Sequence, residues 1–152
     1  MSRVQLALRV ADLEGSIAFY SRLFGVEPAK LRPGYANFAV AEPPLKLVLI
    51  EGGSDEDTRL DHLGVEVEST GQVTAATSRL QEAGLATLEE NAVSCCYAVQ
   101  DKVWVTGPGR ERWEVYVVTS DVGAEGGTGT GSGTGTGTDA GGGTGSKSCC
   151  AA

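Results

Sequence analysis

The sequence QLALRV at residues 5–10 decides the fold, because a similar strand pattern returns at residues 62–67 as HLGVEV. In both segments apolar residues alternate with other residues, so the leucine and valine side chains share one face of a strand. The same shift of 57 residues aligns SRL at residues 21–23 with SRL at residues 78–80. A register that holds across strand, loop and helix indicates that the chain contains an internal duplication.

Each copy continues with a helix and further strands. Apolar residues recur at helical spacing at Leu13, Ile17, Tyr20 and Phe24 in the first copy, and at Val73, Ala76, Leu80 and Ala83 in the second. We expect further strands at residues 36–41 and 46–51, and then at residues 98–100, 103–106 and 112–118. The pattern predicts an α+β domain over residues 1–122, with one module at residues 1–53 and the other at residues 58–122.

The composition limits the classes of partner. The 152 residues carry a net charge of −8, and the clustered lysine and arginine that nucleic acid or an anionic membrane surface requires are missing. No apolar run approaches the roughly 20 residues of a membrane span, and Arg3, Gln5 and Arg9 interrupt any signal-peptide core. We therefore expect a cytoplasmic protein that binds neither nucleic acid nor membrane.

Residues 123–152 differ from the rest of the chain. They hold 12 of the 22 glycines, alternating with threonine and serine, and they carry no large apolar residue. Such a composition cannot offset the entropy of ordering, so we expect a disordered tail that ends in the pair Cys149 and Cys150. A second adjacent pair, Cys95 and Cys96, lies within the domain. Neighbouring cysteines form a strained ring when oxidised to each other, so free thiols are expected in a reducing cytoplasm.

Three polar side chains are expected to face one hollow. If the helices cover the apolar face of the strands, the alternate residues Gln5 and His62 line the opposite, concave face, and Glu114 joins them from the last strand. The same alternation assigns Leu47 to the place of a fourth ligand, which an aliphatic side chain cannot fill. One nitrogen and two oxygen donors with open positions resemble the facial arrangement of non-haem Fe(II) oxygenases, with an amide oxygen in place of one imidazole. A histidine near a strand start is also often only a hydrogen-bonded polar residue, so both interpretations stay open.

Two segments carry a family resemblance. VADLEGSIAFYSRLFG at residues 10–25 and GPGRERWEVY at residues 107–116 resemble the vicinal oxygen chelate superfamily, which includes glyoxalases, extradiol dioxygenases, and fosfomycin and bleomycin resistance proteins. The resemblance covers residues 4–118. It implies two βαβββ modules that form a curved sheet around a metal-lined hollow, but it specifies no substrate.

A more specific resemblance lies in CCYAVQDKVWV at residues 95–105, which is similar to the carbon–arsenic lyases of this superfamily. It implies an enzyme that uses Fe(II) and O2 to degrade trivalent methyl- or aryl-arsenicals to arsenite. The sequence leaves open whether the protein is a monomer or a homodimer. The implied iron ligands and catalytic residues are Gln5, His62 and Glu114, and the implied arsenic ligands are Cys95 and Cys96. The residue chemistry agrees, because trivalent arsenic is soft and thiophilic whereas Fe(II) accepts harder nitrogen and oxygen donors. Adjacent strand residues point to opposite faces, so both sulfurs reach one arsenic only if residues 94–97 form a loop or bulge; the polar residues 89–92 favour a loop there.

Three other functions fit parts of the pattern. A non-enzymatic protein that sequesters drugs or arsenicals needs the hollow but neither metal nor thiols. Another metal-dependent member, such as an extradiol dioxygenase, an isomerase or a thiol transferase, needs the metal but not the cysteines. A thiol-based metal chaperone needs both cysteine pairs and would not depend on His62.

Overall fold

The computed structural model describes residues 1–53, 57–95 and 97–121. Within them the first module consists of β1 (Arg3–Val10), α1 (Leu13–Phe24), β2 (Lys30–Arg32), β3 (Tyr35–Val40) and β4 (Leu45–Glu51). The second consists of β5 (Arg59–Glu66), α2 (Thr70–Glu82), β6 (Leu88–Cys95), β7 (Ala98–Thr106) and β8 (Arg112–Asp121). The prediction of an α+β fold with two βαβββ modules is confirmed. The tail predicted at residues 123–152 lies outside the described residues.

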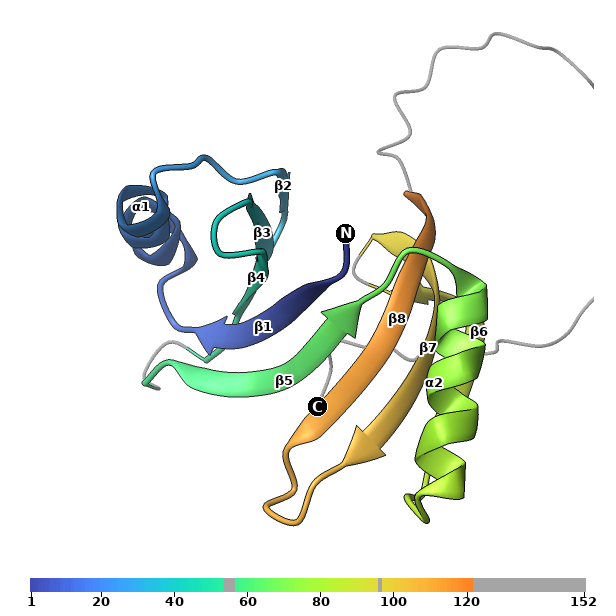
Figure 1. Cartoon of the computed structure of the whole chain (residues 1–152). Helices are drawn as coiled ribbons and strands as arrows, with labels where there is room; N and C mark the ends of the chain where they lie inside the picture. Colours follow the sequence, from blue (N-terminus) through green and yellow to red (C-terminus); the bar gives the residue numbers. More distant parts are fainter. Residues whose placement is uncertain (54–56, 96, 122–152) are drawn as a thin grey trace, which may run out of the picture.

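One curled sheet joins the two modules. Among the described residues it contains eight strands in the order β2-β3-β4-β1-β5-β8-β7-β6. The antiparallel pair of β1 and β5 forms the seam between the modules, while β1 pairs with β4 and β5 with β8 in parallel. Figure 1 shows both helices on the outside of the curl, one beside each module. The inner face of the sheet is thereby left to other side chains.

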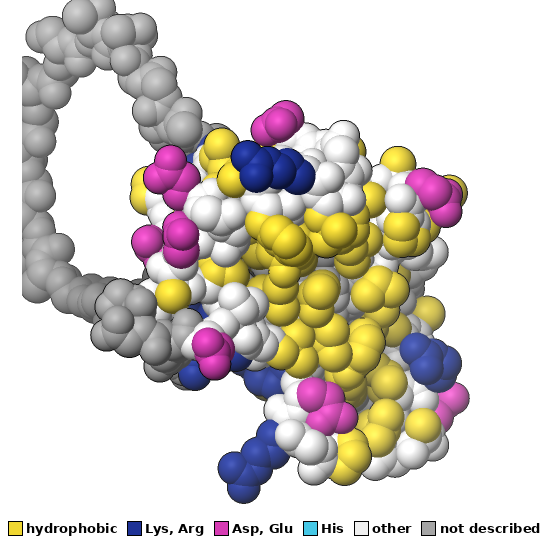
Figure 2. Space-filling model, turned by 90° about the vertical axis from the view of Figure 1, so that its left-hand side faces the viewer, with side chains coloured by type: hydrophobic (Ala, Val, Ile, Leu, Met, Phe, Trp, Pro, Cys, Tyr) yellow, Lys and Arg dark blue, Asp and Glu magenta, His cyan; other side chains and the backbone are white. Residues whose placement is uncertain are grey.

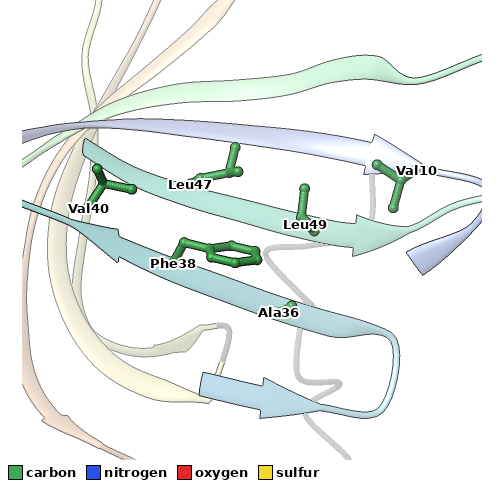
Figure 3. Packing of buried hydrophobic residues seen from close by; sticks show 6 residues of the cluster. All are labelled: Val10, Ala36, Phe38, Val40, Leu47 and Leu49. Carbon is green, nitrogen blue, oxygen red and sulfur yellow. The ribbon is translucent and has the colours of Figure 1, made fainter. Parts of the chain in front are cut away.

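The apolar faces of the strands meet the helices, as the alternation predicts. In the first module the buried side chains of Val10, Ala36, Phe38, Val40, Leu47 and Leu49 form one cluster (Figure 3). Leu13, Ile17, Tyr20 and Phe24 of α1 pack against this cluster. In the second module Val73 and Leu80 of α2 pack with Val103 and Val117. Each fully buried valine, leucine or phenylalanine side chain stabilises the fold by about 1.5–3 kcal/mol.

The two helices differ in how deeply they are buried. Four residues of α2 are buried, whereas no residue of α1 is, and Phe19 and Leu23 of α1 stay more than half exposed. Figure 2 views the side of the molecule on which α1 lies, and apolar side chains gather across this face. None of the described helices is long and apolar enough to cross a membrane.

Two strands and one connection differ from the sequence predictions. The short strand β2 was not expected, and β7 is continuous where two separate strands were predicted. The polar composition of residues 89–92 favours a loop leading into residues 94–97, but residues 89–95 belong to β6. This strand lies at the edge of the sheet and shifts register between Glu90 and Val93, where Ala92 has a φ of 51°. Polar side chains suit an edge strand that is interrupted by a bulge, so composition alone indicated a loop.

Candidate metal centre

Gln5, His62 and Glu114 meet at the seam between the modules. Gln5 on β1 lies opposite Gly64 on β5, and Gly64 lies beside Glu114 on β8. His62 lies opposite Ala7 across the same seam. Because the residues that separate these side chains are alanine and glycine, the three longer side chains reach one another over the concave face.

Close contacts join the three side chains. The amide nitrogen Nε2 of Gln5 lies 2.7 Å from Oε1 of Glu114 and 3.1 Å from Nε2 of His62. The third distance, from Nε2 of His62 to Oε1 of Glu114, is 3.4 Å. All three residues are at most 5% exposed. The structure thus brings together the residues that strand alternation selected.

A β-bulge orients His62. The pairing of β1 with β5 shifts between Ala7 and Leu8, because Ala7 pairs with His62 and Leu8 with Leu60. Asp61 is left without a pairing partner in this register, and its Oδ1 lies 2.6 Å from Nδ1 of His62. Arg9 donates to the other oxygen of Asp61 at 2.6 Å. A carboxylate that accepts from Nδ1–H leaves Nε2 with its lone pair, which is the arrangement of a metal-binding histidine.

Burial and neighbouring charged groups shift the pKa values of His62 and Glu114 in opposite directions. Burial lowers the pKa of His62, but hydrogen bonds to Asp61 and Glu114 outweigh burial and leave this pKa above its ordinary value. Burial likewise raises the pKa of Glu114, yet His62 and Lys102 together hold it below its ordinary value. Nζ of Lys102 donates to Oε2 of Glu114 at 2.8 Å. One oxygen of Glu114 is therefore held by Lys102, and the other faces His62 and Gln5.

A second hydrogen-bond network lies on the side of the Gln5 amide that faces away from His62 and Glu114. The hydroxyl of Tyr116 lies 2.5 Å from Oε1 of Gln5 and 3.0 Å from Oε2 of Glu66. Arg3 and Lys46 pair with Glu66 at 3.2 and 3.3 Å. Burial, together with the nearby carboxylates, raises the pKa of Tyr116, so its hydroxyl keeps its proton.

These three side chains could together occupy one face of an octahedral metal ion. Neighbouring ligands at about 2.1 Å from such an ion lie about 3 Å apart, and the 3.4 Å between Nε2 of His62 and Oε1 of Glu114 is close to that spacing. Among the described residues no group of three His, Cys, Asp or Glu side chains is suited to a metal ion. A site at this position could include the amide of Gln5, which binds metal through its oxygen rather than its nitrogen.

The prediction for Leu47 is wrong. Leu47 lies in the cluster beneath α1, on the outer face of the sheet. Val48 is the residue of the first module that corresponds to Glu114, because Val48 pairs with Ala7 as Glu114 pairs with Gly64. The alignment from alternation was one residue out of register, which moves a side chain to the other face. A valine cannot bind metal either, so the donor set still contains three residues.

A cavity of about 230 Å³ lies in the concave face beside this centre. Glu66 lines it at the end nearest Tyr116 and Gln5, while Ala98 and Asp121 line it toward the turn between β6 and β7. Ala98 pairs with the backbone of Cys95 at that turn, and Tyr97 has a φ of 64°. Of residues 94–97, for which a loop or bulge was considered, Tyr97 lies in a turn, whereas Ser94 and Cys95 belong to β6. The Cys95 side chain and Cys96 lie outside the described residues.

The turn also closes one end of the curl. Nζ of Lys30 on β2 contacts the carboxylate of Asp121 and the carbonyl oxygen of Tyr97. The ring of Tyr97 lies edge-on to Tyr35, with the centroids 5.7 Å apart. These contacts tie the first module to the segment of the second module that carries Cys95.

Sequence reasoning selected the three candidate ligands but missed the residues that orient them. Asp61 was missed because alternation assigns it to the outer face, and only the bulge turns it toward His62. Gly64 shares a strand face with His62 by alternation, but its role of admitting Gln5 and Glu114 was not predicted. The adjacency of a carboxylate to a candidate histidine was the one signal in the sequence that pointed to Asp61.

Comparisons with known proteins agree with this architecture. The family model of the Glyoxalase/Bleomycin resistance protein/Dioxygenase superfamily matches residues 3–115. The chain is 75% identical over 121 residues to the trivalent organoarsenical cleaving enzyme of Thermomonospora curvata, which covers 80% of each chain. It is 40% identical over 123 residues to the trivalent organoarsenical cleaving enzyme of Bacillus sp. (strain MD1), covering 80% of this chain and 76% of that one. It is also 65% identical over 121 residues to the cadmium-induced protein CadI of Mycobacterium tuberculosis, covering 80% and 79%.

Solved structures share the fold at low sequence identity. An extradiol ring-cleaving dioxygenase from B. fuscum superposes with a TM-score of 0.57 at 22% identity, over 80% of this chain and 34% of that one. The Mn(II)-bound glyoxalase from Novosphingobium aromaticivorans superposes with a TM-score of 0.57 at 23% identity, over 80% of this chain and 41% of that one. Fold, family model and relatives agree. The chain belongs to the glyoxalase/bleomycin resistance protein/dioxygenase superfamily and, within it, to the family that includes the trivalent organoarsenical cleaving enzymes.

Proposed function

We propose that this protein is an Fe(II)- and O2-dependent carbon–arsenic lyase that degrades trivalent methyl- or aryl-arsenicals to arsenite. The observation that carries the proposal is the buried meeting of Gln5, His62 and Glu114, with a cavity nearby that Glu66 and Ala98 help to line. The 75% identity to a trivalent organoarsenical cleaving enzyme supports the substrate class.

In this proposal each residue has a distinct task. Nε2 of His62, the inward oxygen of Glu114 and the amide oxygen of Gln5 hold Fe(II), which when bound supplies the redox chemistry toward O2. Asp61 keeps the proton of His62 on Nδ1, so that Nε2 stays available for the metal. Lys102 keeps one oxygen of Glu114 away from the metal, which favours binding through the other oxygen alone.

The thiolates of Cys95 and Cys96 are proposed to hold the arsenic at the turn between β6 and β7. Trivalent arsenic prefers sulfur for the same reason that soft metals do. The organic group would then extend into the cavity toward Gln5. Free thiols require a reducing compartment, so the proposal includes a cytoplasmic location.

The test measures arsenite. Protein loaded anaerobically with Fe(II) receives methylarsenous acid, air is admitted, and arsenite is quantified by chromatography with elemental detection. We expect arsenite from the wild type only when both iron and oxygen are present, and none from His62→Ala. Arsenite formed equally by His62→Ala would exclude this centre as the site of the reaction.

Substitution of the thiols separates arsenic binding from metal binding. We expect Cys95→Ser or Cys96→Ser to abolish arsenite formation while Fe(II) binding stays at the wild-type level, because serine oxygen is a poor ligand for arsenic. Cys149→Ser combined with Cys150→Ser is the matched control, and it is expected to retain turnover. Full turnover by Cys95→Ser would rule out arsenic chelation by the pair.

A second candidate is sequestration without catalysis. The 65% identity to a cadmium-induced protein favours it, since cadmium and trivalent arsenic are both thiophilic. Tight binding of methylarsenous acid without arsenite formation, in protein shown to contain iron, would favour sequestration over the lyase.

A further inference from the structure

The amide of Gln5 is turned the wrong way for a metal ligand. Its nitrogen, not its oxygen, faces Nε2 of His62 and Oε1 of Glu114, and its oxygen faces the hydroxyl of Tyr116. In this orientation the two amide hydrogens satisfy the two acceptors that would otherwise bind a cation. Gln5 must therefore reverse its amide before its oxygen joins the metal ligands.

Such a reversal needs a new partner for the amide nitrogen. Rotation by half a turn about the last side-chain bond exchanges nitrogen and oxygen, which are similar in size, without moving the rest of the residue. The nitrogen then lies where the oxygen was, 2.5 Å from the oxygen of Tyr116. It must donate to that oxygen, because a buried amide without an acceptor is costly.

The hydroxyl of Tyr116 is able to exchange roles in the same step. It carries one hydrogen and has two acceptors within reach, Oε1 of Gln5 at 2.5 Å and Oε2 of Glu66 at 3.0 Å. When the Gln5 nitrogen donates to the Tyr116 oxygen, the Tyr116 hydrogen turns to Glu66. The Tyr116 hydrogen and one of the two amide hydrogens of Gln5 then each have an acceptor.

Glu66 is fixed as that acceptor. Arg3 contacts both of its oxygens, at 3.2 and 3.3 Å, and Lys46 lies 3.3 Å from Oε2. These cations, with the hydroxyl of Tyr116, help to hold the pKa of Glu66 below its ordinary value despite burial, which acts in the opposite direction. Strand pairing keeps the residues of this hydrogen-bond network next to one another, because Gln5 pairs with Lys46 and Glu66 pairs with Tyr116 in the sheet.

We propose that Tyr116, backed by Glu66, is a positioning residue that accepts from the reversed amide of Gln5 and so turns its oxygen toward His62 and Glu114. The inference rests on the proposed metal site. It predicts that the Tyr116 hydroxyl governs how tightly the site holds a metal ion, although this hydroxyl is not itself a metal ligand.

Titration with Co(II) tests the inference without relying on turnover. The dissociation constant is measured by calorimetry, and the visible spectrum of bound Co(II) reports its ligands. We expect Tyr116→Phe to bind Co(II) about tenfold more weakly than the wild type, the lower end of the range for residues that orient metal ligands. Tyr35→Phe is the matched control, because Tyr35 is also a buried tyrosine whose hydroxyl bonds to an amide, that of Asn37 at 3.0 Å. Equal Co(II) affinity in Tyr116→Phe and Tyr35→Phe would overturn the inference.

Two further variants keep the test decisive. Glu66→Gln, which serves if Tyr116→Phe does not fold, is also expected to weaken Co(II) binding because its own amide competes for the Tyr116 oxygen. In a Gln5→Glu background either carboxylate oxygen can bind metal, so the effect of Tyr116→Phe is expected to fall below about twofold. An unchanged tenfold loss in that background would mean that Tyr116 supports only the local packing, which overturns the inference.

The experiment separates the two proposals. A wild type that does not bind Co(II), or a His62→Ala variant that binds it equally well, overturns the metal site and the inference together. Binding that depends on His62 but not on Tyr116 overturns the inference alone.

Discussion

At the scale of single residues, Gly64 determines whether the candidate ligands can meet. A Cβ added there would lie 3.1 Å from Cγ of Glu114 and 3.3 Å from both Cβ and Nε2 of Gln5. These distances are shorter than an ordinary van der Waals contact, and Gln5 and Glu114 are held by buried hydrogen bonds. A side chain at this position must displace one of them.

We therefore expect Gly64→Ala to lower the free energy of unfolding by about 1–3 kcal/mol, the usual cost of overpacking, and to weaken metal binding as well. Urea denaturation and Co(II) titration measure the two effects. Gly71→Ala is the control: its Cβ would meet only Oγ of Ser69 at 3.8 Å, and alanine stabilises helix α2 relative to glycine. A stable Gly64→Ala protein with wild-type affinity for Co(II) would show that the site tolerates a side chain there.

Residue-level predictions succeeded where strict alternation holds. Gln5, His62 and Glu114 lie on regular stretches of strand, so their shared face followed from a period of two. Asp61 was not predicted because it lies at a bulge, where the period breaks and two neighbouring side chains serve the same site. Val48 was confused with Leu47 because a strand of continuous aliphatic residues does not reveal its register.

At the scale of secondary-structure elements, Asp101 connects three of them: β6, β7 and α2. From β7 its carboxylate accepts from the backbone N–H of Ala92 in the β6 bulge at 2.8 Å and from the hydroxyl of Thr70 at the start of α2 at 2.7 Å. These two hydrogen bonds lower the pKa of Asp101 below its ordinary value of 3.8. The carboxylate thus ties an edge strand and a helix terminus to an inner strand.

Asp101→Ala is expected to lower the free energy of unfolding by about 1 kcal/mol at pH 7, since both hydrogen bonds are lost. Because the pKa is depressed in the folded state, the contribution is fully present above pH 3.8 and is lost as the pH falls through the folded-state value. Urea unfolding of wild type and variant from pH 7 downward measures the difference. A difference that grows toward acid pH would contradict this account.

The contacts of Asp101 also explain why the sequence did not predict strand β6. Residues 89–92 are too polar to predict a strand, and the bulge at Ala92 is stabilised by a carboxylate nine residues away. The helices and the inner strands were predictable, because their apolar spacing matches the faces that pack together. An edge strand lacks such a face and depends on its neighbours.

At the scale of the whole molecule, the candidate metal centre spans both modules. Gln5 comes from the first module, whereas His62 and Glu114 come from the second. A metal ion that binds all three side chains would therefore stabilise the joined state. We expect Co(II) at 100 times its dissociation constant to raise the free energy of unfolding by about 2.7 kcal/mol, seen as a higher Tm.

His62→Ala should show no such rise in Tm with added Co(II), which makes it the control for unspecific effects of the ion. An equal rise in both proteins would point to binding elsewhere on the chain.

The internal duplication was readable from sequence and predicted the paired modules. That the modules join edge to edge through β1 and β5 could not be predicted, because the repeat does not indicate which strands pair.

The antiparallel seam has a consequence for how such a centre changes over evolution. Gln5 and His62 occupy equivalent places in the two modules, and so do Val48 and Glu114. In a symmetric assembly of two identical modules, every mutation would change the centre at two equivalent positions. A glutamine and a histidine could then not occupy these two positions. Fusion of the two copies in one gene removes that constraint, so each donor can be exchanged independently of its counterpart.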